Sequence, residues 1–119
     1  MNKINLYLDD LRDCPSGFII ARTVDEALEL FKKYCINIMS LDHDLGCDAD
    51  GNLLKNGYDF VKTFCQEGLF AEKIYIHTDN PVGRENMYQT LLSAQRHEII
   101  SDEIKIHHYP IVENKYSNY

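Results

Sequence analysis

Three clusters of acidic and histidine residues carry side chains that could do chemistry. They are Asp9-Asp10, Asp42-His43-Asp44 and His77-Thr78-Asp79-Asn80, and each follows a short apolar stretch. Carboxylates that lie close together raise one another's pKa, whereas a divalent cation between them removes the conflict. Oxygen ligands favour Mg²⁺ or Mn²⁺, and a histidine ligand would favour Mn²⁺, iron or Zn²⁺. If the fold brings the clusters together, we predict a metal site with the ligands Asp9, Asp10, Asp42 and Asp44.

The histidines of these clusters are candidates for proton transfer. The unperturbed pKa of histidine lies near neutrality, so His43 and His77 could act as general acid or general base. We predict that these two residues are catalytic together with Asp44, which adjoins His43. Two structural alternatives stay open: His77 could be a buried histidine at a strand edge, and Asp44 could cap the following loop.

The segment after His77 has the features of a helix start that could hold an anion. Asn80 is a favourable helix cap, and Pro81 suits the first helical position. A helix N-terminus at this edge is a ready phosphate site. The helix dipole disfavours Arg84 in the first turn, and either a bound phosphate or a salt bridge to Asp79 would account for it. We predict phosphate contacts from Thr78, Asn80, Gly83 and Arg84.

The elements that must position these clusters alternate between short apolar strands and amphipathic helices. Strands are expected at 3–8, 18–21, 36–41, 73–76 and 104–107, and helices at 23–33, 58–66 and 81–98. This order predicts a mostly parallel, three-layer, flavodoxin-like or receiver-like α/β fold with strand order 2-1-3-4-5. The first connection is too short for a crossover helix and is expected to be a loop. Strands one, three and four then end side by side, which unites the three clusters.

Length and composition indicate a single globular domain over residues 1–119, with a polar, flexible tail at 113–119. The net charge of -7 and the lack of a basic patch argue against binding of long duplex nucleic acid. No apolar run approaches the roughly 20 residues of a membrane span, and no signal peptide is visible. The four widely spaced cysteines suit free thiols in a reducing cytoplasm. The sequence indicates neither a protein partner nor an oligomeric state.

Several motifs resemble known families. Asp9-Asp10 and Asp42 resemble the acidic, magnesium-binding pocket of response-regulator receiver domains, but Tyr109-Pro110 replaces the usual Lys-Pro after the last strand. A closer resemblance is to the cyclic-phosphate processing receiver-like domains. It rests on Leu-Asp-Asp-Leu-Arg at 8–12, Ala-Arg-Thr at 21–23, Leu-Asp-His-Asp-Leu-Gly at 41–46, Gly-Tyr-Asp at 57–59 and His-Thr-Asp-Asn-Pro-Val-Gly-Arg-Glu-Asn-Met at 77–87. The resemblance implies processing of nucleotides or RNA ends that bear cyclic phosphates.

We therefore predict a metal-dependent phosphoesterase that acts on a small cyclic phosphate or a nucleotide-like phosphodiester. A cyclic nucleotide or an RNA-end cyclic phosphate would be its substrate. One alternative is a signalling receiver with Asp42 as the phosphoacceptor, which the missing lysine disfavours. Another is a non-catalytic module that binds a phosphorylated metabolite. The two histidines disfavour that module, because pure binding has less need of acid–base groups.

Overall fold

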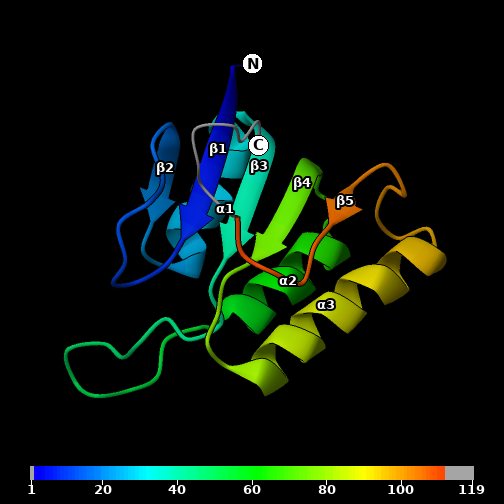
Figure 1. Ribbon diagram of the computed structural model, residues 1–119. Coiled ribbons are helices and arrows are strands. Elements are labelled where there is room, and N and C mark those ends of the chain that lie inside the picture. Colours follow the sequence, from blue (N-terminus) through cyan, green and yellow to red (C-terminus); the bar gives the residue numbers. More distant parts are fainter. Residues whose placement is uncertain (1, 112–119) are drawn as a thin grey trace.

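A parallel sheet of five strands forms the centre of the computed structural model, which describes residues 2–111 (Figure 1). The strands are β1 (Lys3–Leu8), β2 (Phe18–Ala21), β3 (Cys35–Leu41), β4 (Ala71–Ile76) and β5 (Lys105–Ile106). Their order is β2-β1-β3-β4-β5, and every neighbouring pair is parallel. The predicted receiver-like topology is thus confirmed. The predicted flexible tail at 113–119 lies outside the described residues.

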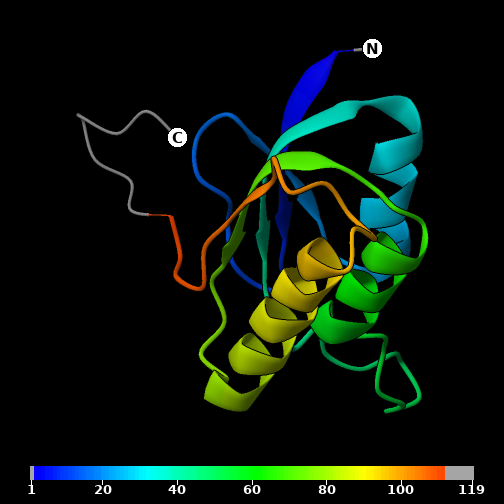
Figure 2. The same ribbon diagram turned by 90° about the vertical axis from the view of Figure 1, so that its right-hand side faces the viewer.

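The described residues contain three helices, α1 (Val24–Lys33), α2 (Gly57–Gln66) and α3 (Pro81–Arg96). All three pack on one face of the sheet, which Figure 2 shows from the side. Their buried side chains join the strand residues of that face in one hydrophobic core, which includes Leu6, Leu8, Leu41, Ile74, Val24, Ala27, Phe60, Phe64, Met87 and Leu91. None of these helices has the length and apolar character needed to span a membrane.

The opposite face of the sheet carries a smaller cluster of Tyr7, Phe18 and Ile38, against which Cys14 packs. Successive strand residues point to opposite faces, so Tyr7 lies on this side while its neighbours Leu6 and Leu8 lie in the main core. No helix covers this face within residues 2–111, so only one of the two predicted outer layers is helical there. The reason is the short β1–β2 connection at residues 9–17, which is a loop as predicted.

Two polar caps fix the starts of α2 and α3 next to the strand ends. Asn56 accepts a hydrogen bond from the Asp59 amide, and the Asp59 carboxylate accepts one from the Asn56 amide. This reciprocal capping box lowers the pKa of Asp59. At α3, Asn80 accepts a hydrogen bond from the Gly83 amide at 2.9 Å, as its predicted capping role requires. Both helices therefore begin at fixed points beside the carboxyl edge of the sheet.

We expect Gly57→Ala to destabilise the junction between β3 and α2. The Gly57 amide donates to the His43 carbonyl at 2.7 Å, and a Cβ at this position would overlap the carbonyl oxygen of Asp42. Because backbone must move to relieve the overlap, the free energy of unfolding should fall by about 1–3 kcal/mol or more. Urea denaturation measures this loss. Gln66→Ala, on the exposed end of the same helix, should change stability by less than about 0.5 kcal/mol. Equal stability of Gly57→Ala and the wild type would contradict the close packing.

Candidate functional site

An acidic hollow of about 360 Å³ lies at the carboxyl edge of the sheet, where β1, β3 and β4 end. Its lining residues are Asp9, Asp10, Leu11, Arg12, Asp42, Asp44, Gly46, Thr78 and Asp79. All four predicted metal ligands and one predicted phosphate contact, Thr78, are among them. The volume lies in the range of small-ligand sites. The convergence of three strand ends therefore builds a site from clusters that are far apart in the sequence.

Asp9 is fully buried, and each of its carboxylate oxygens has fixed partners. Oδ1 accepts hydrogen bonds from the backbone amides of Leu11 and Arg12, both at 2.9 Å. Oδ2 lies 3.0 Å from Nε2 of His77. Burial alone would raise the pKa of Asp9, but these bonds outweigh it and hold the pKa below its usual value. Asp9 is therefore a preformed carboxylate with a fixed orientation.

His77 is buried between polar partners on both sides of its ring. Nδ1 lies 2.6 Å from the Ser40 hydroxyl, which is fully buried, and Nε2 faces Asp9. The ring also stacks on Tyr7, with centroids 4.2 Å apart and planes 5° apart. Burial lowers the pKa of His77 despite the neighbouring carboxylates, which favours the neutral imidazole. All these bonds are satisfied if Nε2–H donates to Asp9 and the Ser40 hydroxyl donates to Nδ1.

Asp42 lies across the hollow from Asp9 and has the opposite electrostatic character. Burial raises its pKa, and the negative charge of Asp9 adds to the effect. Hydrogen bonds from the Thr78 hydroxyl and from the His43 amide, the latter at 2.8 Å, act against this rise. The fold thus stabilises the charged form of Asp9 and destabilises the charged form of Asp42. A cation between them would relieve the conflict.

The structure brings Asp9, Asp42 and His77 close enough to share one metal ion. Each offers a ligand atom, and these atoms lie within 4.8 Å of one another. The two carboxylate oxygens suit Mg²⁺ or Mn²⁺; Nε2 of His77 could add a nitrogen ligand, which favours Mn²⁺, iron or Zn²⁺, only by giving up its hydrogen bond to Asp9. Asp10 and Asp44 line the hollow outside this close group. Their predicted role as metal ligands stays a prediction.

His43 and Asp44 form a pair on the more exposed side of the site. Nδ1 of His43 lies 2.8 Å from Oδ1 of Asp44 and 3.4 Å from the side-chain nitrogen Nδ2 of Asn80. The imidazole also packs on the first turn of α3, because a Cβ on Gly83 would come within 2.5 Å of the ring. Gly83 therefore permits the contact between α3 and His43, and its predicted role in phosphate binding is not tested by this geometry.

Arg84 has a structural partner instead of a free guanidinium. Its Nη2 donates to the backbone carbonyl of Thr78 at 2.6 Å, and its buried Nε has no hydrogen-bond partner among the described residues. Asp79, the alternative partner considered for Arg84, instead pairs with Arg12 at 2.6 Å. Arg84 thus holds the β4–α3 turn. Its predicted contact with phosphate stays a prediction that would require this bond to break.

Three functional candidates were not predicted from the sequence: Arg12, Arg22 and Ser40. Arg12 lines the hollow and donates to the His77 carbonyl at 3.0 Å. Arg22 donates to the carbonyls of Asp9 and Arg12 and so braces the loop that holds both. Arg12 lies in the motif at 8–12 and Arg22 in the motif at 21–23, so these motifs could have indicated both arginines as functional candidates. Ser40 and Asn37 are the two polar residues of the otherwise apolar strand β3, and nothing in the local sequence marks the contact of Ser40 with His77.

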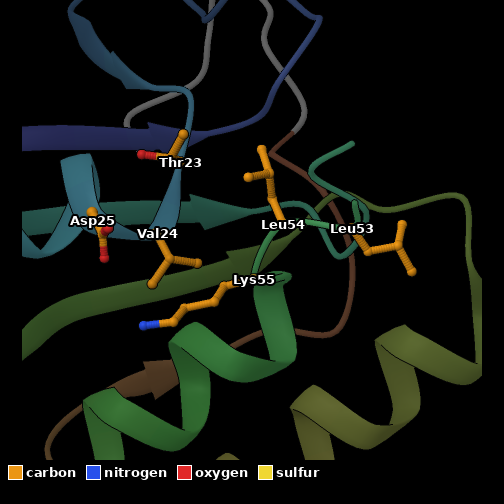
Figure 3. A pocket seen from close by; sticks show the side chains of 6 residues that line it. All are labelled: Thr23, Val24, Asp25, Leu53, Leu54 and Lys55. Atoms are coloured by element: carbon orange, nitrogen blue, oxygen red, sulfur yellow. The ribbon is translucent and has the colours of Figure 1, made fainter. Parts of the chain in front are cut away.

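A second hollow, of about 300 Å³, lies between the start of α1 and the loop before α2 (Figure 3). Val24, Leu54 and the stem of Lys55 form its walls, with Thr23 and Asp25 at its side. In Figure 3, Leu54 points towards Thr23, whereas Leu53 points away from α1. The lining of this hollow contains one acid, one base and no histidine. The candidate metal ligands therefore lie at the first hollow.

Comparison with known proteins gives one match. The family model described as the cyclic-phosphate processing receiver domain matches residues 4–93, which include all three clusters of the site. The searches of the curated proteins and of the solved structures found no match.

Proposed function

Because the chain belongs to the cyclic-phosphate processing receiver domain family, we propose that it is a metal-dependent phosphoesterase that cleaves a cyclic phosphate or a nucleotide-like phosphodiester. The observation that carries this proposal is the close group of Asp9, Asp42 and His77 in a hollow of ligand size. A family tie to cyclic phosphates supports the substrate class, and the donor set supports the metal.

In the proposed reaction, Asp9 and Asp42 would hold the metal ion, and Asp10 and Asp44 line the same hollow. When bound, such an ion polarises the phosphoryl group and lowers the pKa of a water molecule. The chain itself supplies a preformed ligand, because the Leu11 and Arg12 amides fix the orientation of Asp9 before any ion binds. His77 preserves that orientation from the other side.

Arg12 is the proposed contact for the phosphate oxygens. Among the described residues that line the hollow, it is the one cation. Its partner Asp79 is 90% exposed, and such surface ion pairs are worth only about 0–1 kcal/mol. The guanidinium can therefore exchange Asp79 for a phosphate at little cost, and it presents the fork geometry that suits phosphate. Asn80 and Thr78 remain the predicted neutral contacts at the same edge.

His43 is the proposed proton-transfer group, with Asp44 as its orienting partner. Its side chain is 15% exposed and Nδ1 is bonded to Asp44, which lines the hollow, whereas both nitrogens of His77 are occupied inside the protein. A general acid or base must reach the substrate directly or through one water. This requirement favours His43 over His77. The proton-transfer role predicted for His77 stays open to the kinetic test in the Discussion.

The signalling alternative would use Asp42 as a phosphoacceptor. Tyr109 stands at the position of the receiver lysine, and its hydroxyl lies 2.9 Å from Nδ1 of His107. Tyr109 is thus bonded to the residue that follows β5 and is not one of the residues that line the hollow. Acetyl phosphate and Mg²⁺ are therefore expected to leave little stable acyl phosphate on Asp42. Stoichiometric phosphorylation that is lost in Asp42→Asn would favour the signalling alternative.

The proposed function is tested by hydrolysis assays. We expect turnover of 2′,3′-cyclic nucleotides, cyclic dinucleotides or aryl phosphodiesters with Mg²⁺, Mn²⁺ or Zn²⁺, and complete loss of turnover in excess chelator. Arg12→Gln should lower kcat/KM by about 10²-fold, the usual scale for one group that stabilises developing charge. Asp102→Asn, an acid-to-amide change on an exposed loop outside the hollow, should leave turnover unchanged. Failure of every substrate with every metal would overturn the proposal.

A further inference from the structure

Three buried polar side chains, Ser40, His77 and Asp9, form a chain of contacts that ends at the acidic hollow. Their exposed fractions are 0%, 4% and 1%. The Ser40 hydroxyl lies 2.6 Å from Nδ1 of His77, and Nε2 of the same ring lies 3.0 Å from Oδ2 of Asp9. Of the three, only Asp9 lines the hollow. The Ser40 hydroxyl therefore acts on the hollow through the ring of His77.

The Ser40 hydroxyl favours one tautomer of the neutral His77 ring. Among the described residues, His77 is the only hydrogen-bond partner of this hydroxyl. If the hydroxyl donates to Nδ1, the ring proton is on Nε2, where it is donated to Asp9. With the proton on Nδ1, the hydroxyl hydrogen would lack an acceptor, and the lone pair of Nε2 would face a carboxylate. Because a buried donor without an acceptor is costly, the contacts at both ends of the ring favour the proton on Nε2.

Asp9 keeps one acceptor position for a metal ion. A carboxylate offers about four lone-pair positions. The amides of Leu11 and Arg12 occupy the two on Oδ1, and the ring of His77 occupies one on Oδ2. The guanidinium Nε of Arg12 stays 3.9 Å from Oδ2, which is beyond hydrogen-bond distance. Asp9 therefore offers one lone pair of Oδ2 to an ion, whereas Nε2 of His77 offers a hydrogen and no lone pair.

We propose that Ser40 is a positioning residue that keeps His77 from binding the metal ion. A ring nitrogen ligates a metal through its lone pair, so Nε2 can bind an ion only after the ring proton has moved to Nδ1. The Ser40 hydroxyl opposes that move. The close ligand group then offers carboxylate oxygens alone, which shifts its selectivity towards Mg²⁺ and away from Zn²⁺. This inference rests on the metal site of the proposed function and does not depend on hydrolysis.

The test compares the affinities of the wild type and of Ser40→Ala for Mg²⁺ and Zn²⁺ by calorimetry. In Ser40→Ala, the ring proton can move to Nδ1 without leaving a hydroxyl unpaired. We expect the Kd for Zn²⁺ to fall at least about tenfold and the Kd for Mg²⁺ to stay within about threefold. Ser40→Thr, which keeps the hydroxyl, should retain the wild-type ratio of the two Kd values. Ser93→Ala, the same change beside the exposed His97, is the matched control and should leave both affinities unchanged.

Two further measurements show whether the gain in Zn²⁺ affinity passes through His77. Long-range proton–nitrogen NMR correlations should place the ring proton of His77 on Nε2 in the metal-free wild type and on Nδ1 in Ser40→Ala loaded with Zn²⁺. The double variant Ser40→Ala/His77→Gln should lack the gain, because glutamine donates to Asp9 but has no ring nitrogen. A merely structural role of Ser40 would change the two affinities alike and would not depend on His77.

The outcomes separate this inference from the proposed function. A ring proton on Nδ1 in the metal-free wild type, or equal changes of both affinities in Ser40→Ala, would overturn the inference alone. If Ser40→Ala does not fold, His77→Gln decides: an unchanged Kd for Zn²⁺ supports the exclusion of His77, and a tenfold weaker one overturns it. Metal binding without hydrolysis would count against the phosphoesterase alone. Binding of neither metal to the wild type would overturn the inference and the metal of the proposed function together.

Discussion

Asp42→Asn is expected to abolish the stabilisation that a divalent metal ion gives to the folded protein. An ion that binds only the folded state raises the free energy of unfolding by RT ln(1 + [L]/Kd), about 2.7 kcal/mol at a hundredfold excess over Kd. Asparagine keeps the shape of Asp42 and can still accept the His43 amide, but it removes one of the two carboxylates in the close ligand group. The melting temperature with and without millimolar Mg²⁺, Mn²⁺ or Zn²⁺ measures the effect.

The same substitution should not weaken the metal-free protein. Burial and Asp9 raise the pKa of Asp42 in the fold, so its charged form at neutral pH opposes folding. The opposition is fully present above the folded pKa, and it declines as the pH falls from the folded pKa to the lower pKa of the unfolded chain. A neutral asparagine removes this cost at pH 7, and metal-free Asp42→Asn should be at least as stable as the wild type.

Asp102→Asn is the matched control, because it makes the same chemical change on an exposed residue outside the hollow. It should keep the full metal-induced rise in melting temperature. A rise that persists in Asp42→Asn would exclude Asp42 as a ligand. No rise in the wild type with any of these metals would remove the metal from the proposed function.

His77→Ala and His77→Gln are expected to differ sharply. Alanine leaves the buried Asp9 and Ser40 without their partner, which costs about 1–3 kcal/mol of stability for an unsatisfied buried group. Loss of the group that orients a metal ligand typically weakens metal affinity about 10- to 100-fold. Glutamine can still donate an N–H to Asp9 but cannot transfer a proton at neutral pH. It should therefore keep most of the metal affinity.

The kinetics of these two variants decide between the two roles of His77. A positioning role predicts that His77→Gln retains kcat at saturating metal, and that His77→Ala needs more metal to reach its maximum. A general acid–base role, which the sequence predicts, requires a fall in kcat of about 10²–10⁴-fold in both variants with metal binding intact. His43→Ala, measured beside them, should show that fall if proton transfer belongs to the His43–Asp44 pair.

The arrangement of strands was predictable, because periodicity and chain order restrict a parallel sheet to few topologies. That arrangement alone brings Asp9, Asp42 and His77 together, since adjacent parallel strands end at one edge. The partners of each side chain were not predictable. The Ser40–His77 contact depends on the register of β3 against β4, in which Ser40 lies opposite Tyr75, two residues before His77.

Charged residues of the turns were the least predictable part of the site. Arg84 follows Asp79 closely in the sequence and was the partner considered for it, whereas Arg12 is 67 residues away and the sequence does not mark it as a partner. The structure pairs Arg12 with Asp79 and directs Arg84 to the carbonyl of Thr78. Long side chains in loops choose among several partners of similar energy, so three-dimensional geometry alone selects one. The proposed phosphate contact of Arg12 therefore rests on the structure, and the contact predicted for Arg84 stays a prediction.

The loop at residues 9–17 joins the site to the helix-free face of the sheet. It holds Asp9 and Arg12 at one end, and its Cys14 packs on the Tyr7, Phe18 and Ile38 cluster at the other. Side chains brace it: Asp9 accepts its amides, and Arg22 donates to its carbonyls. We expect a segment held in this way to open as a unit, so that its opening exposes the sheet face and separates the ligand group in one event. A ligand that binds in the hollow should therefore oppose local unfolding of the β1–β2 edge.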